Sequence, residues 1–363
     1  MKPYLPQSLP LRTLAWESLV PLIGKANGAL ARYDGVLQGV PNPDILLSPL
    51  TTKEAVLSSR IEGTITTLEE VLEFDASSSP KPERLADIQE VVNYRSAMQM
   101  AVKELGTRPL CLRTMLDIHS VLMDSVRGRD KGRGQFRKKQ NYIGKPGASV
   151  EEMSFIPPEA SGLMKYMDNL ERYIHYEEKD RLVQVAIIHA QFEMIHPLLD
   201  GNGRVGRILI PLFLYEKKML SRPVFYLSEY LEAHRDDYVA RLKAISADGD
   251  WQGWIQFFLE AVVAQAKANC EKAMAILGLY EEMKTKIAQV TRSRFSIKAL
   301  DAVFRNPVFR TTDFASRSGI PKRSALRILD LLREEGLLLT VKEGRGQQPS
   351  VLLFHPLIRV VEN

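Results

Sequence analysis

The stretch HPLLDGNGRVGR, residues 196–207, holds the densest group of chemically special side chains in this chain. An apolar helical pattern, LVQVAIIHAQFEMI, runs into His196. Because Pro197 disfavours continuation of that helix, we expect His196 at a helix end. Gly201-Asn202-Gly203 then opens a second helix, RVGRILIPLFLYE. The unpaired N–H groups and the dipole at the start of this helix favour an anion.

Four side chains around the second helix start fit phosphate chemistry. Arg204 and Arg207 are three residues apart, so both can donate to phosphate oxygens from one helix face. Asp200 supplies a hard oxygen suited to magnesium, and His196 is positioned as a general base. Each feature alone also fits a structural role, such as a tight turn, a core histidine or a solvated arginine pair. Their combination within twelve residues favours a nucleotide site.

These twelve residues resemble the signature of the Fic domain, written H-P-F-x-D-G-N-G-R-x-x-R, with Leu198 in place of the usual phenylalanine. Flanking segments such as LDIHSVLM, GQFR and DWQGWIQFFLEA extend the resemblance over residues 50–265. The resemblance implies a protein adenylyltransferase that transfers AMP from ATP to a hydroxyl side chain of a target protein, with Mg²⁺ as cofactor. The target would carry the modified hydroxyl on Ser, Thr or Tyr.

The resemblance also implies individual roles. His196 would deprotonate the target hydroxyl, Asp200 would hold Mg²⁺, and Arg204 and Arg207 would bind the β- and γ-phosphates. The backbone of 201–203 and the Asn202 side chain would line the anion hole. Tyr230, Arg235 and Tyr238 are candidates for the nucleoside side of the pocket, although their helical spacing fits a structural role equally well. The full expected ATP-binding set is Glu62, His196, Gly201, Asn202, Gly203, Arg204, Val205, Gly206, Arg207, Tyr230, Arg235 and Tyr238.

Residues 135–158 form an expected irregular hairpin among helices. By resemblance this hairpin corresponds to the Fic flap, which holds the target segment by strand addition. A plain surface hairpin is the alternative. The expected flap residues are Asn141, Tyr142, Ile143, Gly144, Phe155 and Ile156.

The segment SSRIEG contains Ser58, Glu62 and Gly63 in the pattern S-x-x-x-E-G, which is similar to the inhibitory motif of Fic proteins. By that resemblance Glu62 pairs with Arg207 and blocks the γ-phosphate. A helix-surface pair followed by a glycine cap is the bland alternative. A further alternative makes the enzyme bifunctional, with Glu62 as a base for removal of AMP.

The whole chain reads as mainly α-helical, and its 363 residues suggest several domains. We expect an N-terminal helical extension over 1–105, a catalytic Fic domain over 106–270, and a connecting helix with a winged-helix-like domain over 271–363. A capping box, either Thr66 with Glu69 or Thr67 with Glu70, begins one helix. A single helix is expected over residues 229–246.

The C-terminal segment is basic: residues 291–350 hold twelve Lys and Arg against six Asp and Glu, while the net charge of the whole chain is +5. Its helix, turn, helix and hairpin pattern predicts a winged helix. The rival function is therefore a DNA-binding regulator acting through 311–350, with Arg323 and Arg327 on the recognition helix. The sequence leaves a homo-oligomer open. Two isolated cysteines and the lack of a long apolar run predict a cytoplasmic protein without a membrane span.

Overall fold

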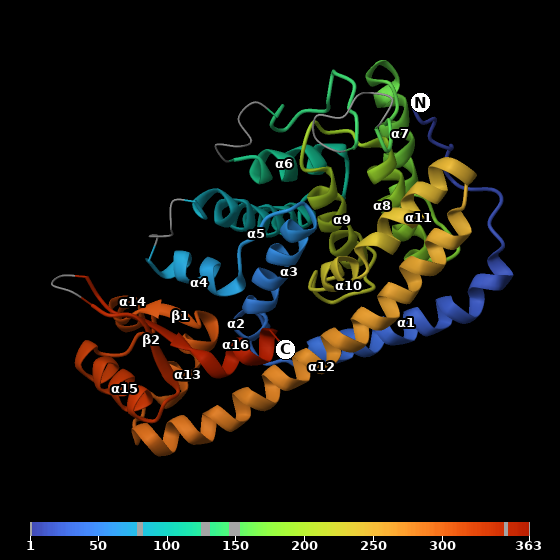
Figure 1. Cartoon of the computed structure of the whole chain (residues 1–363). Helices are drawn as coiled ribbons and strands as arrows, with labels where there is room; N and C mark the ends of the chain where they lie inside the picture. The colour runs from blue at the N-terminus through green and yellow to red at the C-terminus, as the bar shows by residue number, and fades with distance from the viewer. Residues whose placement is uncertain (1, 78–82, 125–130, 145–152, 345–347, 363) are drawn as a thin grey trace. The chain divides into compact units, whose positions relative to one another are not determined.

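The structure is a computed structural model that describes residues 2–77, 83–124, 131–144, 153–344 and 348–362. It is mainly α-helical, as the sequence predicts, with a small three-stranded sheet (Figure 1). The chain forms two compact units, one of residues 1–34, 57–63 and 92–267, the other of residues 35–56, 64–91 and 268–363. Residues 1–105 contribute to both units, and the division into three domains stays a prediction.

Four helices run from one unit into the other: α1 (Trp16–Gly39), α3 (Ser48–Ile61), α5 (Leu85–Leu105) and the 41-residue α12 (Trp251–Thr291). The first unit also holds α6 (Leu112–Leu122), the short 3₁₀ turn η3 (Ala160–Gly162), α7 (Leu163–Ile174), α8 (Arg181–Ile195), α9 (Asn202–Glu216), α10 (Ser228–Ala233) and α11 (Arg235–Asp248). None of the helices among the described residues is long and apolar enough to cross a membrane.

Helix α8 is the centre of the first unit. Its residues from Leu182 to Ile195 are buried with the exception of Glu193, because α7, α9 and α11 pack around it. A helix that is apolar on all sides is stable only in such an enclosed position. The two helices α8 and α9 pack against each other, so the motif loop between them is held at both ends by the core.

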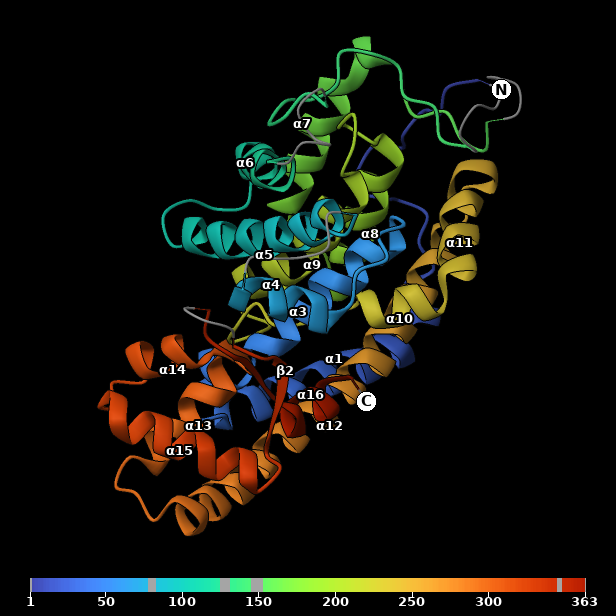
Figure 2. The ribbon, with the colours of Figure 1, turned by 60° about the vertical axis from the view of Figure 1, so that its left-hand side comes forward.

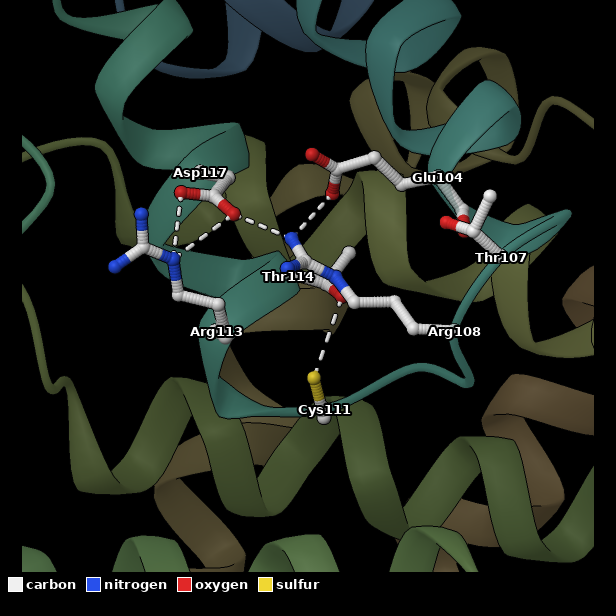
Figure 3. Close-up of polar contacts among 7 residues, drawn as sticks. All are labelled: Glu104, Thr107, Arg108, Cys111, Arg113, Thr114 and Asp117. Carbon is white, nitrogen blue, oxygen red and sulfur yellow. Dashed lines mark hydrogen bonds and ion pairs between the residues drawn. The ribbon is translucent and has the colours of Figure 1, made fainter.

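The turn from α5 into α6 is held by charged side chains (Figure 3). Arg108 donates to Glu104 at 2.7 Å and also to Asp117, and Arg113 donates to Asp117 at 3.1 Å. One arginine thus ties the end of α5 to the second turn of α6. This fixes the start of α6, the helix whose His119 lies beside the motif loop.

The predicted helix-end signals appear in the structure. Thr67 and Glu70 form the capping box at the start of α4 (Leu68–Ser77): the Thr67 N–H donates to the Glu70 carboxylate at 3.0 Å, and the Glu70 N–H donates to the Thr67 hydroxyl at 3.2 Å. Gly63, just after α3, has φ 100°, a conformation that favours glycine. Of the two capping boxes considered, the structure selects Thr67 with Glu70.

One predicted helix, over residues 229–246, is interrupted. Helix α10 ends at Ala233 and α11 begins at Arg235, with His234 between them at φ −116° and ψ 38°. The ring of His234 stacks on Tyr230 with centroids 4.0 Å apart. The prediction missed this break because neither glycine nor proline marks it.

The second unit contains α2 (Pro43–Leu46), α4, α13 (Ser296–Arg305), β1 (Val308–Arg310), α14 (Thr311–Arg317), α15 (Lys322–Glu334), β2 (Leu338–Lys342), β3 (Val351–Phe354) and α16 (His355–Glu362). The antiparallel sheet has the order β1-β3-β2, and α13, α14 and α15 lie beside it (Figure 2). Gly319, at φ 63°, makes the turn between α14 and α15. The predicted hairpin tip lies partly outside the described residues, and a winged-helix function stays a prediction.

Candidate active site

His196 ends α8 in a left-handed backbone conformation, with φ 48° and ψ 61°. Its Nδ1 lies 3.3 Å from the carbonyl oxygen of Glu193. Because a carbonyl oxygen only accepts hydrogen bonds, Nδ1 carries the proton and Nε2 carries the lone pair. Burial lowers the pKa of His196 to about 4. The imidazole is therefore neutral at pH 7, and its Nε2 can accept a proton.

The loop between α8 and α9 is shaped by the side chain of Asn202. Its Nδ2 donates to the Leu198 carbonyl at 2.9 Å, and its Oδ1 accepts from the Leu198 N–H at 2.9 Å. Both polar ends of this amide are thus engaged by the loop backbone. The Asn202 side chain therefore shapes this loop, and its expected role in lining the anion hole stays a prediction. Leu198 itself is fully buried, which fits an apolar packing role.

Gly201 and Asp200 form the start of α9. Gly201 is the N-cap residue at φ 77°, and its N–H donates to Asp200 Oδ1 at 2.6 Å. The same carboxylate oxygen lies 3.7 Å from Nη2 of the buried Arg204. Asp200 is thereby oriented at the mouth of the helix start, with 43% of its side chain exposed.

Arg207 is bound by the predicted inhibitory residues. Its Nε donates to the Ser58 hydroxyl at 2.8 Å, and its Nη2 donates to the Ser58 carbonyl at 2.9 Å and to Glu62 Oε1 at 2.6 Å. Only 2% of the Arg207 side chain is exposed, against 38% for Glu62. Burial acts to raise the pKa of Glu62, but the charge and hydrogen bond of Arg207 outweigh it and lower the pKa. The Glu62 carboxylate therefore stays ionised beside Arg207.

Gly203, in the first turn of α9, lets the Glu62 carboxylate reach the helix backbone. A Cβ atom at this position would collide with Oε1 of Glu62 and come within 2.9 Å of Arg207 Nη1. Glu62 therefore occupies the N-terminal turn of α9, where the sequence predicts an anion. The carboxylate is itself the anion held there in this structure.

Two buried polar side chains near Arg207, His189 and Tyr238, are hydrogen-bonded to each other. His189 of α8 is hydrogen-bonded at Nδ1 to the Gly206 carbonyl (3.1 Å) and at Nε2 to the Tyr238 hydroxyl (3.0 Å). Burial lowers the pKa of His189 to about 3, so the ring is neutral. His189 is thus a buried histidine with both ring nitrogens hydrogen-bonded. Tyr238 is buried with its hydroxyl fixed by this bond.

The flap is paired at its base. Ile143 and Phe155 exchange backbone hydrogen bonds of 2.9 and 3.0 Å, while the predicted turn between them, residues 145–152, lies outside the described residues. Asn141 Nδ2 donates to the Leu198 carbonyl at 2.8 Å. The flap is therefore tied directly to the motif loop.

Arg137 is a further link between flap and loop that the sequence reasoning did not single out. Its Nε donates to the His196 carbonyl at 2.8 Å, and Nη2 donates to the Pro158 carbonyl at 2.5 Å. The Arg137 N–H donates to the Pro197 carbonyl at 2.8 Å. This buried guanidinium holds the backbone of His196. Its signal in the sequence is its place in the GQFR segment just before the flap.

A cavity of about 260 Å³ joins the motif, the inhibitory segment, the flap and α11. Eight of its lining residues belong to the sets predicted from the sequence: Glu62, Ile143, Phe155, His196, Gly203, Arg207, Arg235 and Tyr238. The structure thus brings together in one cavity residues up to 176 positions apart in the chain, from Glu62 to Tyr238. Glu193, which was not predicted, also lines it.

Other predicted residues lie outside the lining of this cavity. Tyr230 stacks on His234, and Tyr142 is exposed. Val205 is fully buried, as an apolar helix residue packs. Gly206 is in close contact with Glu193, since a Cβ there would collide with Oε1 of that residue. The cavity lining also lacks these predicted residues: Ser58, Gly63, Asn141, Gly144, Ile156, Gly201, Asn202 and Arg204.

Asp200 is the residue that the sequence predicts as a magnesium ligand. The described residues contain no group of three or more His, Cys, Asp or Glu side chains that could hold a metal ion. Magnesium in nucleotide sites is held by one or two carboxylates plus substrate phosphates, so a single exposed carboxylate fits. Asp200 is such a carboxylate, at the start of the helix where phosphate is expected.

Comparison with known proteins adds the family. Residues 20–103 match the Fic/DOC family N-terminal region, and residues 109–214 match the Fic/DOC family itself. The chain is 31% identical over 111 residues to the protein adenylyltransferase Fic of Drosophila erecta, covering 29% of this chain and 20% of that protein. It is 26% identical over 157 residues to the corresponding Drosophila yakuba protein, covering 42% and 28%. The chain thus spans less than a third of the length of these curated relatives.

Solved structures share the fold. A Fic family protein from Desulfovibrio desulfuricans G20 superposes with a TM-score of 0.56 at 20% identity, covering 96% of this chain and 98% of that one. A Fic domain containing signaling protein from Bacteroides thetaiotaomicron gives a TM-score of 0.56 at 15% identity, covering 69% and 96%. The first of these likenesses extends over nearly the whole chain and so includes most of both units.

Proposed function

Because this chain belongs to the Fic/DOC family, we propose that it is a protein adenylyltransferase that transfers AMP from ATP to a Ser, Thr or Tyr hydroxyl of a target protein and of itself. One observation carries the proposal. The unprotonated Nε2 of His196 belongs to a ring that lines the same cavity as Arg207. A base and a phosphate-binding cation therefore share one site.

The reaction follows from these positions. Nε2 of His196 removes the proton of the target hydroxyl while the hydroxyl oxygen forms a bond to the α-phosphorus of ATP. The bond from the α-phosphorus to the bridging oxygen breaks, and pyrophosphate leaves with the electron pair. Backbone N–H groups at the start of α9 stabilise the negative charge on the α-phosphate oxygens. Arg207 holds the terminal phosphates once Glu62 has left it.

Asp200 is the residue that would hold Mg²⁺, whose chemistry is to neutralise phosphate charge. Its orientation by the Gly201 N–H and by Arg204 supports this role. Asp200→Ala should weaken the magnesium dependence of both ATP binding and transfer. A variant with an unchanged magnesium requirement would exclude Asp200 as the ligand.

We also propose that Glu62 inhibits the enzyme. Its carboxylate uses the Arg207 donors that the γ-phosphate needs, and it sits against Gly203 at the helix start. ATP then binds with displaced phosphates, so its α-phosphorus is poorly placed for in-line attack. Whether Glu62 also assists removal of AMP is a separate alternative that depends on the same residue.

The test of the activity uses two forms of ATP. The Glu62→Gly protein is incubated with magnesium and with ATP labelled at the α- or the γ-phosphate, and modified residues are located by mass spectrometry. We expect label from the α-position only. Label from the γ-position would identify a kinase-type reaction, and no label from either form would contradict adenylyl transfer.

One observation keeps DNA binding as a second candidate function. Arg323 and Arg327 are both exposed on α15, the second helix of the helix-turn-helix pattern. If they contact phosphates, affinity for duplex DNA should fall steeply with rising salt. Filter binding across a salt series tests this independently of AMP transfer, and a lack of binding at low salt would exclude it.

A further inference from the structure

Glu193 has an unusual position that the proposed mechanism does not use. It lies on α8 one turn before His196, and its carboxyl group reaches across to the backbone of α9 at Gly206. Oε1 of Glu193 is buried and has no hydrogen-bond partner among the described residues. A buried polar atom without a hydrogen-bond partner is destabilising. Glu193 nonetheless lines the cavity that holds His196 and Arg207.

Titratable groups approach Glu193 from α9, from the end of α3 and from α11. Arg207 faces it from α9, Glu62 follows α3, and Tyr238 lies on α11. On its own helix, His189 and His196 flank it and are both neutral, since burial lowers the pKa of each. The same cavity is also lined by two basic residues of α11: Arg235 and Lys243.

These surroundings favour the protonated acid. Burial raises the pKa of Glu193 to about 8; Arg207 acts to lower it and Glu62 to raise it further. At pH 7 the carboxyl group is therefore mainly neutral. A neutral carboxylic acid has an O–H group to donate, whereas a carboxylate can only accept.

We propose that Glu193 is a nucleotide-binding residue that acts as a protonated carboxyl group and donates a hydrogen bond to a phosphate oxygen held by Arg207. The inference rests on the proposed adenylyltransferase function. A carboxylate in this position would repel the polyphosphate, while the neutral acid supplies the donor that an incoming anion needs. In the inhibited state the Glu62 carboxylate is that anion, so Glu193 is kept protonated before ATP arrives.

The proposal predicts a coupling between ATP affinity and pH. Bound phosphate keeps Glu193 protonated, so ATP binding must take up a proton wherever the free protein has lost it. With a pKa of about 8 in the free protein, the affinity should fall about eightfold between pH 7.5 and pH 9. Ionised Glu193 also competes with the phosphates of ATP for Arg207, and this competition likewise lowers the ATP affinity at high pH.

The test is a pH series of ATP binding by calorimetry, comparing the wild-type protein with Glu193→Gln. Glutamine has the same shape, still donates a hydrogen bond and cannot ionise. We expect the eightfold loss in the wild type and a nearly constant affinity in Glu193→Gln. The ionisation of ATP itself is common to both proteins and cancels. Equal pH dependence of the two proteins would overturn the role of Glu193.

A second measurement counts the protons directly in the wild-type protein and in Glu193→Gln. Binding heats of the wild-type protein at pH 8.5, recorded in buffers of different ionisation enthalpy, count the protons taken up with ATP. We expect most of one proton per ATP beyond the uptake measured with Glu193→Gln. No difference would refute the inference while leaving adenylyl transfer standing. A complete lack of ATP binding at every pH would overturn both the inference and the proposed function.

Discussion

Removing the Glu62 carboxylate should turn the proposed enzyme on. In the structure Arg207 donates to Glu62 at 2.6 Å and holds two further bonds to Ser58. Glu62→Gly deletes only the first contact, so Ser58 continues to orient the guanidinium. Arg207 is then already in position to bind the γ-phosphate. The Glu62→Gly change should therefore raise the rate of AMP transfer without requiring Arg207 to change its position.

The magnitude follows from the exposure of the pair. Hydrogen bonds to charged groups contribute about 1.5–3 kcal/mol, whereas ion pairs between exposed side chains contribute about 0–1 kcal/mol. Arg207 is 2% exposed but Glu62 is 38% exposed, so solvent screens the contact in part. We take the lower half of the first range, about 1.5–2 kcal/mol. Since 1.4 kcal/mol corresponds to a factor of ten, transfer should rise about 10- to 30-fold.

The assay measures incorporation of α-labelled AMP into the protein itself at one magnesium concentration. Four proteins are compared: wild type, Glu62→Gly, the isosteric Glu62→Gln, and Glu62→Gly with Arg207→Ala. Glu62→Gln keeps a neutral hydrogen bond to Arg207 and should give an intermediate rate. The double variant should fall back, because the freed arginine is the cause of the gain. Equal incorporation by wild type and Glu62→Gly would refute the inhibitory role.

His196→Ala should retain ATP binding but lose transfer by about 10²- to 10⁴-fold, because the base acts only on the target hydroxyl. Parallel assays of ATP binding and AMP transfer check this prediction. Near-normal transfer by the variant would exclude His196 as the base. The pKa of His196, lowered to about 4, predicts that transfer stays nearly constant from pH 7.5 to 5.5. A histidine with the usual pKa of about 6.5 would lose roughly nine-tenths of its base form at pH 5.5, so such a loss of rate would contradict the buried environment. Thr67→Ala removes the side-chain cap of α4. It should lower the free energy of unfolding, measured in urea, by about 0.5–2 kcal/mol and leave the ATP affinity unchanged. An unchanged urea concentration at the unfolding midpoint would argue against the cap.

Backbone rules made the motif region predictable. Pro197 and Gly201 act locally, so the helix expected to run into His196 and the helix expected after Gly201 appear as α8 and α9. The capping box of Thr67 with Glu70 is equally local and is confirmed, although the sequence left two choices. A local rule also failed at His234, where no residue with special backbone preferences marks the break between α10 and α11.

Side-chain directions in the site were less predictable, because they depend on which helices pack together. The Asn202 amide turns inward to Leu198, and Tyr230 stacks on His234 instead of lining the cavity. Glu193 was missed because a glutamate in an apolar helix has no fixed meaning in sequence. A signal existed: after Arg181 at its start, Glu193 is the one charged residue of this mostly apolar helix, four residues after His189 and three before His196.

Under the proposed inhibition by Glu62, Gly203 restricts where activating substitutions can occur. A side chain at this position would expel the Glu62 carboxylate, but it would fill the same helix start that the nucleotide needs. A substitution of Gly203 that displaces Glu62 from Arg207 should therefore also block nucleotide binding. Activating substitutions are instead expected at Glu62, whose carboxylate holds Arg207. A screen for hyperactive alleles should accordingly return changes in the segment SSRIEG, while changes at Gly203 should be recovered only among alleles that have lost activity.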